Sequence, residues 1–464
     1  MTTLWTSDAI AQATGGTASA AFGVRGAAFD SREVGEGDLF VALSGEATDG
    51  HRFLAQAFEQ GAAGAVVTGP CEGAHVRVAD TFAALNDLAR SSRARTDAKI
   101  IGVTGSVGKT SAKEALFAAL DRGWPDAVHR SVKSYNNHTG VPLSLVRMPQ
   151  ASRAGVFEMG MNHPGELAIL TRIVRPHVAI VTAIAPAHAE FFPDESAIAD
   201  AKGEIFQGLE PGGVAIVPFD SPHRDRLIEA ARPYAARVVT FGTGKGADVH
   251  ALESMRVKTG GSFVTAKVGE RELSFTLSQP GEHWVSNALA VLAAVDAAGG
   301  DLGLAGLALA DLGGLAGRGA RFTAAVDGGP HPGGALIIDE SYNANPASMA
   351  ATLAVLAREP GRHVAVLGEM RELGDKSPAY HAALSGPVLD ARVETAVLVG
   401  EAMAPLAAAL EQKVNLVHVP DAATALEAVR AVLRDGDAVL VKGSNGVGLA
   451  RVVAELRAGL RGGT

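Results

Sequence analysis

Short apolar runs alternate with helix-length segments through most of this chain, and no other feature of the sequence constrains the fold as strongly. Between residues 99 and 218, the runs KIIGVTG, AGVFEMG, HVAIVTAIA and GGVAIVP are separated by segments long enough for helices. Runs that are apolar at nearly every position are typical of parallel strands with both faces buried. We therefore expect an α/β protein with a mostly parallel central sheet covered by helices on both faces.

The pattern changes at two points, which predicts three domains in a chain of 464 residues. Residues 1–94 contain short strand-like pieces around a helical segment and form a small N-terminal α/β domain. Residues 95–321 form the central domain, in which the more polar stretch from 235 to 280 is expected to be antiparallel. Residues 322–464 repeat strand and helix in a Rossmann-like pattern of their own.

Composition excludes several classes of protein. The formal net charge is -9 and acidic and basic residues are mixed along the chain, which argues against nucleic acid as a ligand. Cys71 is the only cysteine, so no disulfide forms within the chain. The N-terminus lacks the pattern of a signal peptide, and Asp and Gly interrupt every long apolar stretch, so we expect no membrane span. We expect a cytoplasmic monomer.

The segment GVTGSVGKTSAKEAL, residues 102–116, reads as the end of a strand, a glycine loop and the start of a helix. In such a loop, backbone N–H groups face an anion, a lysine neutralises the outer phosphates and a hydroxyl ligates Mg²⁺. The strict P-loop pattern has glycine where this chain has Val103. The alternative is an ordinary turn with a surface lysine. The candidate ATP-binding residues are Gly105, Ser106, Val107, Gly108, Lys109 and Thr110.

Two later apolar runs end in polar side chains, Glu158 and His188. Ligands of an open parallel sheet collect at the carboxyl edge of its strands, so both are expected to converge with Lys109 and Thr110 on one crevice. A hydroxyl, a carboxylate and an imidazole beside a polyphosphate favour Mg²⁺ or Mn²⁺. Taken singly, Glu158 reads as a solvated acid and His188 as a loop or core histidine.

Two further candidates are open on chemistry alone. The polar loop SVKSYNNHTG contains Asn136, Asn137 and Thr139, which suit either a phosphate or polar substrate, or a simple turn and helix cap. Lys202 lies on a predicted helix, where most lysines are solvated.

Taken together, these motifs resemble those of the Mur ligases, the ATP-dependent amide ligases of bacterial cell-wall synthesis. The resemblance covers nearly the whole chain and includes DSREVGEGDLF, GKTSAKEAL, FEMGMNHPGEL, AKGEIF, GEHWVSNAL, GRGARF, DESYNANPASM, LGEMRELG and VKGSNG. It implies a shorter phosphate loop, which accounts for Val103. It also implies that ATP phosphorylates a peptide carboxylate and that an amine then attacks the acyl phosphate. The implied substrates are UDP-N-acetylmuramoyl-tripeptide and D-alanyl-D-alanine, with ATP and Mg²⁺.

By matched position, the resemblance implies a role for each candidate residue. Catalytic roles fall to Lys109, Glu158, His188 and Lys202, with Lys202 as a carbamate that joins Thr110, Glu158 and His188 around the metal. The nucleotide is further contacted by Asn287, Arg318 and either Asp339 or Glu340. Substrate contacts fall to Ser31, Arg32, Asn136, Asn137, Thr139, Ser341, Tyr342, Asn343 and Asn345.

The chain departs from the family pattern at Ala183, Trp284 and Asn445, where Asn, Asn and Arg are usual, and at the acidic pair Asp339 and Glu340. Three other functions are consistent with the sequence. They are a different Mur-type ligase, a folylpolyglutamate synthetase-like enzyme, and a nucleotide-dependent binding protein without catalysis.

Overall fold

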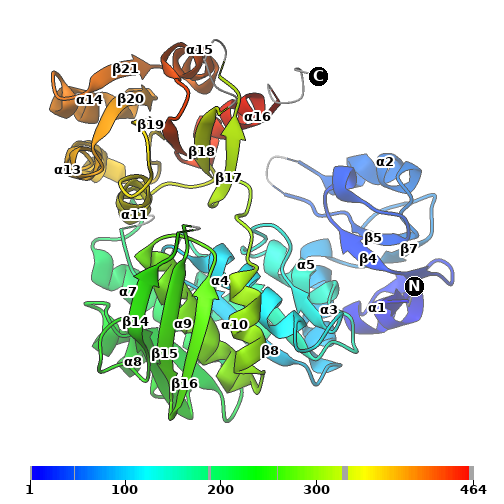
Figure 1. Cartoon of the computed structure of the whole chain (residues 1–464). Helices are drawn as coiled ribbons and strands as arrows, with labels where there is room; N and C mark the ends of the chain where they lie inside the picture. The colour runs from blue at the N-terminus through cyan, green and yellow to red at the C-terminus, as the bar shows by residue number, and fades with distance from the viewer. Residues whose placement is uncertain (1–2, 46–47, 187–189, 259, 327–332, 459–464) are drawn as a thin grey trace.

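The computed structural model describes residues 3–45, 48–186, 190–258, 260–326 and 333–458, and these form three α/β domains in chain order (Figure 1). In the figure, the central domain, cyan to green, lies below the C-terminal domain, and the blue N-terminal domain lies to its right. The predicted fold class is confirmed. Within the described residues, no helix is both long enough and apolar enough to span a bilayer.

The N-terminal domain is built on a five-stranded sheet in the order β2-β7-β6-β5-β4. Its elements are β1 (Trp5–Thr6), α1 (Ser7–Thr14), β2 (Thr17–Ala18), β3 (Gly23–Val24), β4 (Gly26–Ala28), β5 (Asp38–Val41), α2 (Leu54–Glu59), β6 (Gly64–Val67), β7 (His75–Arg77) and α3 (Thr81–Ala94). Trp5, Ile10 and Leu88 belong to the same buried cluster as Leu143 and Phe157 of the central domain. The two domains therefore share one hydrophobic core.

The central domain is built on a nine-stranded sheet in the order β16-β15-β14-β13-β12-β11-β8-β10-β9. Its strands are β8 (Lys99–Thr104), β9 (Val128–Arg130), β10 (Ala154–Glu158), β11 (Val178–Val181), β12 (Val214–Pro218), β13 (Arg237–Gly242), β14 (Val249–Arg256), β15 (Ser262–Val268) and β16 (Arg271–Leu277). Its helices are α4 (Lys109–Asp121), α5 (Gly140–Val146), α6 (Glu166–Val174), α7 (Glu195–Gly203), α8 (Arg224–Ala231), α9 (Glu282–Ala298) and α10 (Leu302–Ala310).

Strand pairing in the central sheet is parallel from β9 to β14 and antiparallel from β14 to β16. The prediction of antiparallel strands for residues 235–280 is correct for β14 to β16 and wrong for β13. β13 follows helix α8, and a helical crossover returns the chain parallel to the preceding strand.

The C-terminal domain is built on a six-stranded sheet in the order β17-β18-β22-β19-β20-β21, in which only β17 is antiparallel to its neighbour. Its strands are β17 (Ala320–Ala324), β18 (Ala335–Glu340), β19 (His363–Gly368), β20 (Val393–Val399), β21 (Asn415–Val419) and β22 (Ala438–Lys442). Its helices are α11 (Pro346–Leu356), α12 (Ser377–Ala383), α13 (Ser385–Asp390), α14 (Ala404–Leu410), α15 (Ala422–Val432) and α16 (Leu449–Ala458).

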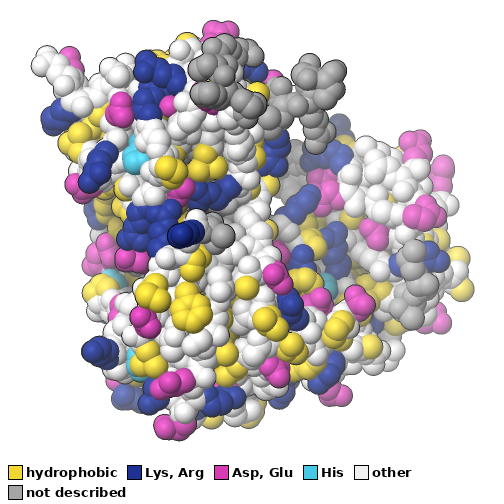
Figure 2. Space-filling view, viewed as in Figure 1, with side chains coloured by type: hydrophobic (Ala, Val, Ile, Leu, Met, Phe, Trp, Pro, Cys, Tyr) yellow, Lys and Arg dark blue, Asp and Glu magenta, His cyan; other side chains and the backbone are white. Residues whose placement is uncertain are grey.

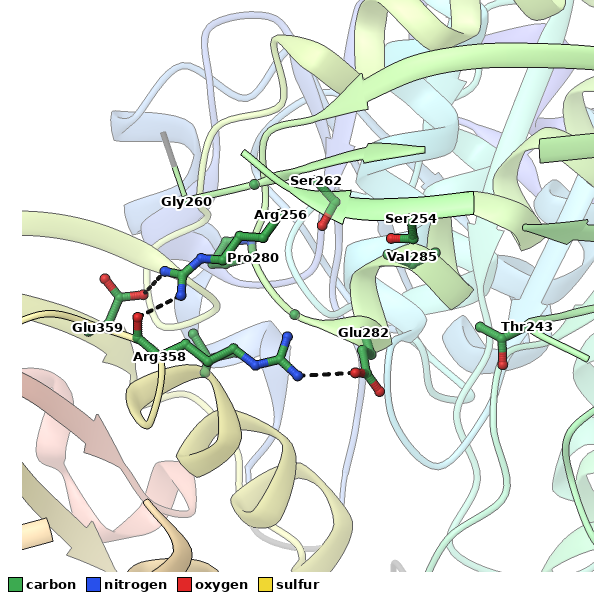
Figure 3. Close-up of a pocket in the computed structure, with 13 residues that line it drawn as sticks. Thr243, Ser254, Arg256, Gly260, Ser262, Pro280, Glu282, Val285, Arg358 and Glu359 are labelled. Atoms are coloured by element: carbon green, nitrogen blue, oxygen red, sulfur yellow. Dashed lines mark hydrogen bonds and ion pairs between the residues drawn. The ribbon is translucent and has the colours of Figure 1, made fainter. Parts of the chain in front are cut away.

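The C-terminal domain has buried clusters of its own on the two faces of its sheet, and none of their described members comes from the central domain. Ion pairs and hydrogen bonds instead cross the boundary, around a cavity of about 290 Å³ (Figure 3). Glu359 pairs with Arg256 of β14 at 3.1 Å, and Arg358 pairs with Glu282 of α9 at 3.1 Å. Figure 2 shows acidic and basic side chains interspersed over this face of the molecule.

The substitution Glu359→Gln tests the strength of this polar boundary. The Glu359 side chain is 5% exposed and also pairs with Arg321 at 2.5 Å, so the change leaves two guanidinium groups without a counter-charge. We expect the C-terminal domain to be destabilised by roughly 1–3 kcal/mol, measured as a lower calorimetric unfolding midpoint. Glu253→Gln, on an exposed position of β14, is the matched control. Equal unfolding midpoints for the two variants would show that the ion pairs of Glu359 do not stabilise the domain boundary.

Candidate active site

The phosphate loop leaves the carboxyl end of β8 and enters helix α4, and its shape requires glycine. Gly105 has φ +153°, and a Cβ at this position would lie 1.9 Å from Oγ1 of Thr182. Gly108 caps α4 with φ +83°. The end of β11 supports the loop, because the Thr182 hydroxyl donates to the carbonyls of Thr104 and Val107. The loop therefore presents its N–H groups and the start of a helix to one space.

Glu158, at the end of β10, is brought beside the loop as the strand-end rule predicts. Its carboxylate is 1% exposed and accepts hydrogen bonds from the Thr110 hydroxyl and the Asn136 amide, both at 2.8 Å. The Lys113 ammonium is 4.0 Å away. These contacts offset the desolvation of the charge. Lys109 donates to the Gly105 carbonyl at 2.6 Å, and burial lowers the pKa of Lys109 while Glu158 raises it.

A cavity of about 530 Å³ joins the phosphate loop to the carboxyl edge of the C-terminal sheet. Predicted site residues from both domains line it: Ser106, Val107, Gly108, Lys109, Thr110, Asn136, Glu158, Asn287, Arg318, Glu340, Tyr342, Asn343 and Asn345. Trp284 and Ala183, two of the departures from the family pattern, line it as well. The residues come from segments far apart in the chain, so the cavity depends on how the domains pack.

Arg318 reaches the cavity from the linker between the two domains. Its guanidinium lies 4.3 Å from the centroid of the Tyr342 ring and donates to Ser134 at 3.4 Å. The buried Asp339 carboxylate fixes this linker, because it accepts from the N–H of Gly317 at 2.8 Å. Asp339 also accepts from the hydroxyl of Ser341 at 2.7 Å. Asp339 and Ser341 therefore hold the linker and the strand end, and neither lines the cavity.

Several other predicted residues lie away from the cavity. The Asn137 side chain accepts hydrogen bonds from the N–H and hydroxyl of Thr139 and from the N–H of Gly140. These contacts agree with the alternative in which this loop is a simple turn before a helix. Ser31 is buried and donates to Gln56, and Arg32 is exposed and pairs with Asp30. Both belong to the N-terminal domain.

Lys202, on helix α7, is 1% exposed and lies near Lys109. Burial, with a smaller effect from Lys109, places the pKa of Lys202 well below its usual value. This contradicts the reading of Lys202 as a solvated helical lysine. His188 falls outside the described residues.

A loop over residues 131–137 connects the N-terminal domain to the cavity. Glu33, next to Arg32, accepts hydrogen bonds from Lys133 and from the Tyr135 hydroxyl. On the other side of the loop, Lys113 donates to the carbonyls of Ser131 and Lys133 at 2.9 and 2.8 Å. The loop therefore links the N-terminal motif to the groups around Glu158.

Sequence reasoning missed several residues of this region, among them Lys442, Ser134 and Lys113. Lys442 lines the cavity at the end of β22, and the strand-end rule that located Glu158 applies to it equally. Ser134 lines the cavity from the loop over 131–137. Lys113 is buried, and no pattern distinguishes it in sequence from a solvated helical lysine.

The fold and the cavity define a nucleotide-binding protein of the α/β class. The sequence matches the family models "Mur ligase family, catalytic domain" over residues 24–98, "Mur ligase middle domain" over 103–295 and "Mur ligase, glutamate ligase domain" over 326–445. The chain is 34% identical to the UDP-N-acetylmuramoyl-tripeptide--D-alanyl-D-alanine ligase of Bacillus subtilis, with 93% of each chain covered. This chain belongs to the Mur ligase family, whose members are ATP-dependent.

Two solved structures share the fold over nearly their full length. MurF from Acinetobacter baumannii superimposes with a TM-score of 0.83 at 32% identity, with 97% of this chain and 98% of that chain covered. MurF ligase from Thermotoga maritima in complex with ADP superimposes with a TM-score of 0.78 at 26% identity, covering 95% and 99%.

The substitution Lys109→Met tests the phosphate loop. It removes the cation at the start of α4 and keeps the length of the side chain, so we expect ATP to bind about tenfold to hundredfold more weakly. Isothermal titration calorimetry measures this directly. Lys245→Met removes an exposed lysine that does not line the cavity and is the control. ATP affinity equal to that of the unaltered protein would contradict the assignment.

Proposed function

We propose that this protein is an ATP-dependent ligase that joins D-alanyl-D-alanine to UDP-N-acetylmuramoyl-tripeptide in peptidoglycan precursor synthesis. One observation carries the proposal: a single cavity is lined both by a phosphate loop and by the strand ends of the C-terminal sheet. Such a cavity can hold a nucleotide and an acceptor together. The names of relatives that match over most of the chain support the choice of substrates.

The reaction follows from the chemistry of a free carboxylate, which is a poor acyl donor. An oxygen of the tripeptide carboxylate attacks the γ-phosphorus of ATP, the bond to the β-phosphate oxygen breaks and ADP leaves. The dipeptide amine then attacks the acyl carbon, loses a proton and displaces phosphate. Lys109 and Arg318 lie where they can offset the repulsion between carboxylate and triphosphate. Closure of the two domains around the cavity would exclude water from the acyl phosphate.

Mg²⁺ fits the oxygen atoms beside the loop. The Thr110 hydroxyl and the buried Glu158 carboxylate already lie 2.8 Å apart, and both are hard donors. Within the described residues, no group of three or more His, Cys, Asp or Glu side chains forms a metal cage. Mg²⁺ in phosphate sites uses one or two protein oxygens, with phosphates and water as further ligands. When bound, the ion would screen the phosphate charge.

Of the two acids at the end of β18, we assign the nucleotide contact to Glu340. Glu340 lines the cavity, whereas the Asp339 carboxylate accepts hydrogen bonds from Gly317 and Ser341. Asn287 lies against the phosphate loop, since a Cβ on Gly108 would be 2.8 Å from its Oδ1. Asn287 and Glu340 therefore hold the nucleoside from opposite domains.

We further propose that residues 1–94 hold the UDP end of the substrate, with Ser31 and Arg32 nearby, that residues 95–321 bind ATP, and that residues 322–464 present the amine. The contact of Glu33 with Lys133 and Tyr135 supports this order, because it lies between the N-terminal motif and the cavity.

The test of the function is phosphate release from ATP across a panel of UDP-muramoyl peptides and D-amino acid dipeptides. We expect release that requires both UDP-N-acetylmuramoyl-tripeptide and D-alanyl-D-alanine. A preference for a shorter muramoyl peptide and a single amino acid would indicate a different Mur-type ligase. Release that no acceptor changes would indicate a nucleotide-dependent binding protein.

We propose that Lys202 acts as a carbamate. The lowered pKa of Lys202, caused by burial, favours the neutral amine, which adds to CO₂ and releases one proton to give an anion. Such an anion would add an oxygen ligand for Mg²⁺ and offset the charge of Lys109.

Lys202→Ala tests the carbamate. We expect the variant to lose turnover and to recover part of it with formate or acetate, which replace the missing carboxylate. Asp200→Asn, on an exposed position of the same helix, is the control and should remain active without added carboxylate. An alanine variant with full activity would contradict the proposal.

A further inference from the structure

The cavity contains one buried cation to which the proposed reaction gives no role. Lys442 ends strand β22 and is 2% exposed, yet it lines the cavity between the domains. Its ammonium donates to the carbonyl of Asn343 at 2.9 Å and lies 3.8 Å from Oε2 of Glu340. Burial of an unpaired ammonium is unfavourable in free energy, so we expect Lys442 to have a charged partner or a role in the site.

The pairing with Glu340 follows from the backbone. Strands β18 and β22 are parallel neighbours, and Glu340 lies directly opposite Lys442 in their register. Both are the last residues of their strands, so both side chains lie at the carboxyl edge of the sheet. The alignment holds the charges together without the flexibility of a loop.

Three charged groups act on the Glu340 carboxylate. Lys442 from β22 and Arg318 from the linker favour its charged form, and Asp339 from its own strand disfavours it. Burial is the largest effect and raises the pKa of Glu340 above its usual value. Burial thus opposes the charge of the Glu340 carboxylate, and the two cations oppose the effect of burial. Arg318 also interacts with Tyr342 and Ser134.

We propose that Lys442 is a positioning residue that keeps the Glu340 carboxylate ionised and directed into the nucleotide cavity. This inference rests on the proposed function, in which Glu340 contacts the nucleotide. Lys442 acts through its charge on the neighbouring strand; burial lowers the pKa of Lys442, and the Glu340 carboxylate opposes that effect. His283 of α9 faces Lys442 across the cavity, and burial, with a smaller effect from Lys442, lowers the pKa of His283 to about 4. Its hydrogen bond to Asn343 fixes where that charge lies.

The experiment measures ATP affinity by calorimetry between about pH 6 and pH 8. The affinity of the unaltered protein at each pH is the reference, because the terminal phosphate of ATP takes up a proton within this range. In Lys442→Met the pKa of Glu340 rises further, so the ionised fraction falls as the pH decreases. Relative to the unaltered protein, affinity should then fall toward pH 6, by up to tenfold for each unit below the new pKa. Methionine fills a similar volume without a charge and is compatible with burial.

Two further variants separate charge from structure. Lys442→Gln keeps a donor for the Asn343 carbonyl but carries no charge, and should show the same pH dependence as Lys442→Met. The double variant Glu340→Gln with Lys442→Met has no carboxylate at position 340 to titrate, so its affinity should be weak and should change with pH no more than that of the unaltered protein.

Three results would overturn the inference. The first is a Lys442→Met variant whose affinity changes with pH no more than that of the unaltered protein, and the second is a Lys442→Gln variant that behaves as the unaltered protein. The third is a Glu340→Gln variant with undiminished affinity, which would also remove Glu340 from the nucleotide site. Failure of the proposed function is distinguishable, because it would show as an unaltered protein that binds ATP but does not join the two substrates.

Discussion

The active-site region depends on one buried charge, the carboxylate of Glu158. A carboxylate that is 1% exposed must find partners inside the protein, and it finds them in Thr110 of the loop helix and Asn136 of a distant loop. The same interactions therefore position the oxygens to which we assign Mg²⁺, the start of α4 and the loop that leads to the N-terminal domain. Lys113 stabilises this arrangement, because its ammonium donates hydrogen bonds to two backbone carbonyls of that loop.

The second constraint is the different character of the two domain boundaries. The N-terminal and central domains share a hydrophobic core, whereas ion pairs such as Arg256 with Glu359 join the central and C-terminal domains (Figure 3). A polar boundary permits relative motion more readily than a packed core. This suits a ligase that must admit two substrates and then exclude water, since the cavity is complete only when Arg318 and Glu340 face the phosphate loop.

The order and pairing of most strands could be predicted from the sequence, because they depend on the course of the backbone. The contacts of individual side chains could not, because they depend on side-chain orientation and packing. Apolar runs predict parallel strands, and the strand-end rule brings Glu158 to Lys109, because both depend on the course of the chain. Whether Asn137 faces a substrate or caps a turn depends on its χ angles, and the sequence left both open. Burial of Lys202 and Lys442 depends on packing between distant segments, which no local pattern reveals. The antiparallel prediction was wrong for β13, because this strand alternates buried and partly exposed residues although it pairs in parallel with both of its neighbours.

The central claim is that ATP activates the tripeptide carboxylate through transfer of the γ-phosphoryl group. The most direct test uses UDP-N-acetylmuramoyl-tripeptide labelled with ¹⁸O in that carboxylate, together with ATP and D-alanyl-D-alanine. Mass spectrometry of the released phosphate should find one ¹⁸O atom in each phosphate for each new amide bond, because the carboxyl oxygen leaves with phosphorus. Phosphate that carries no label, with the amide bond formed, would contradict the account.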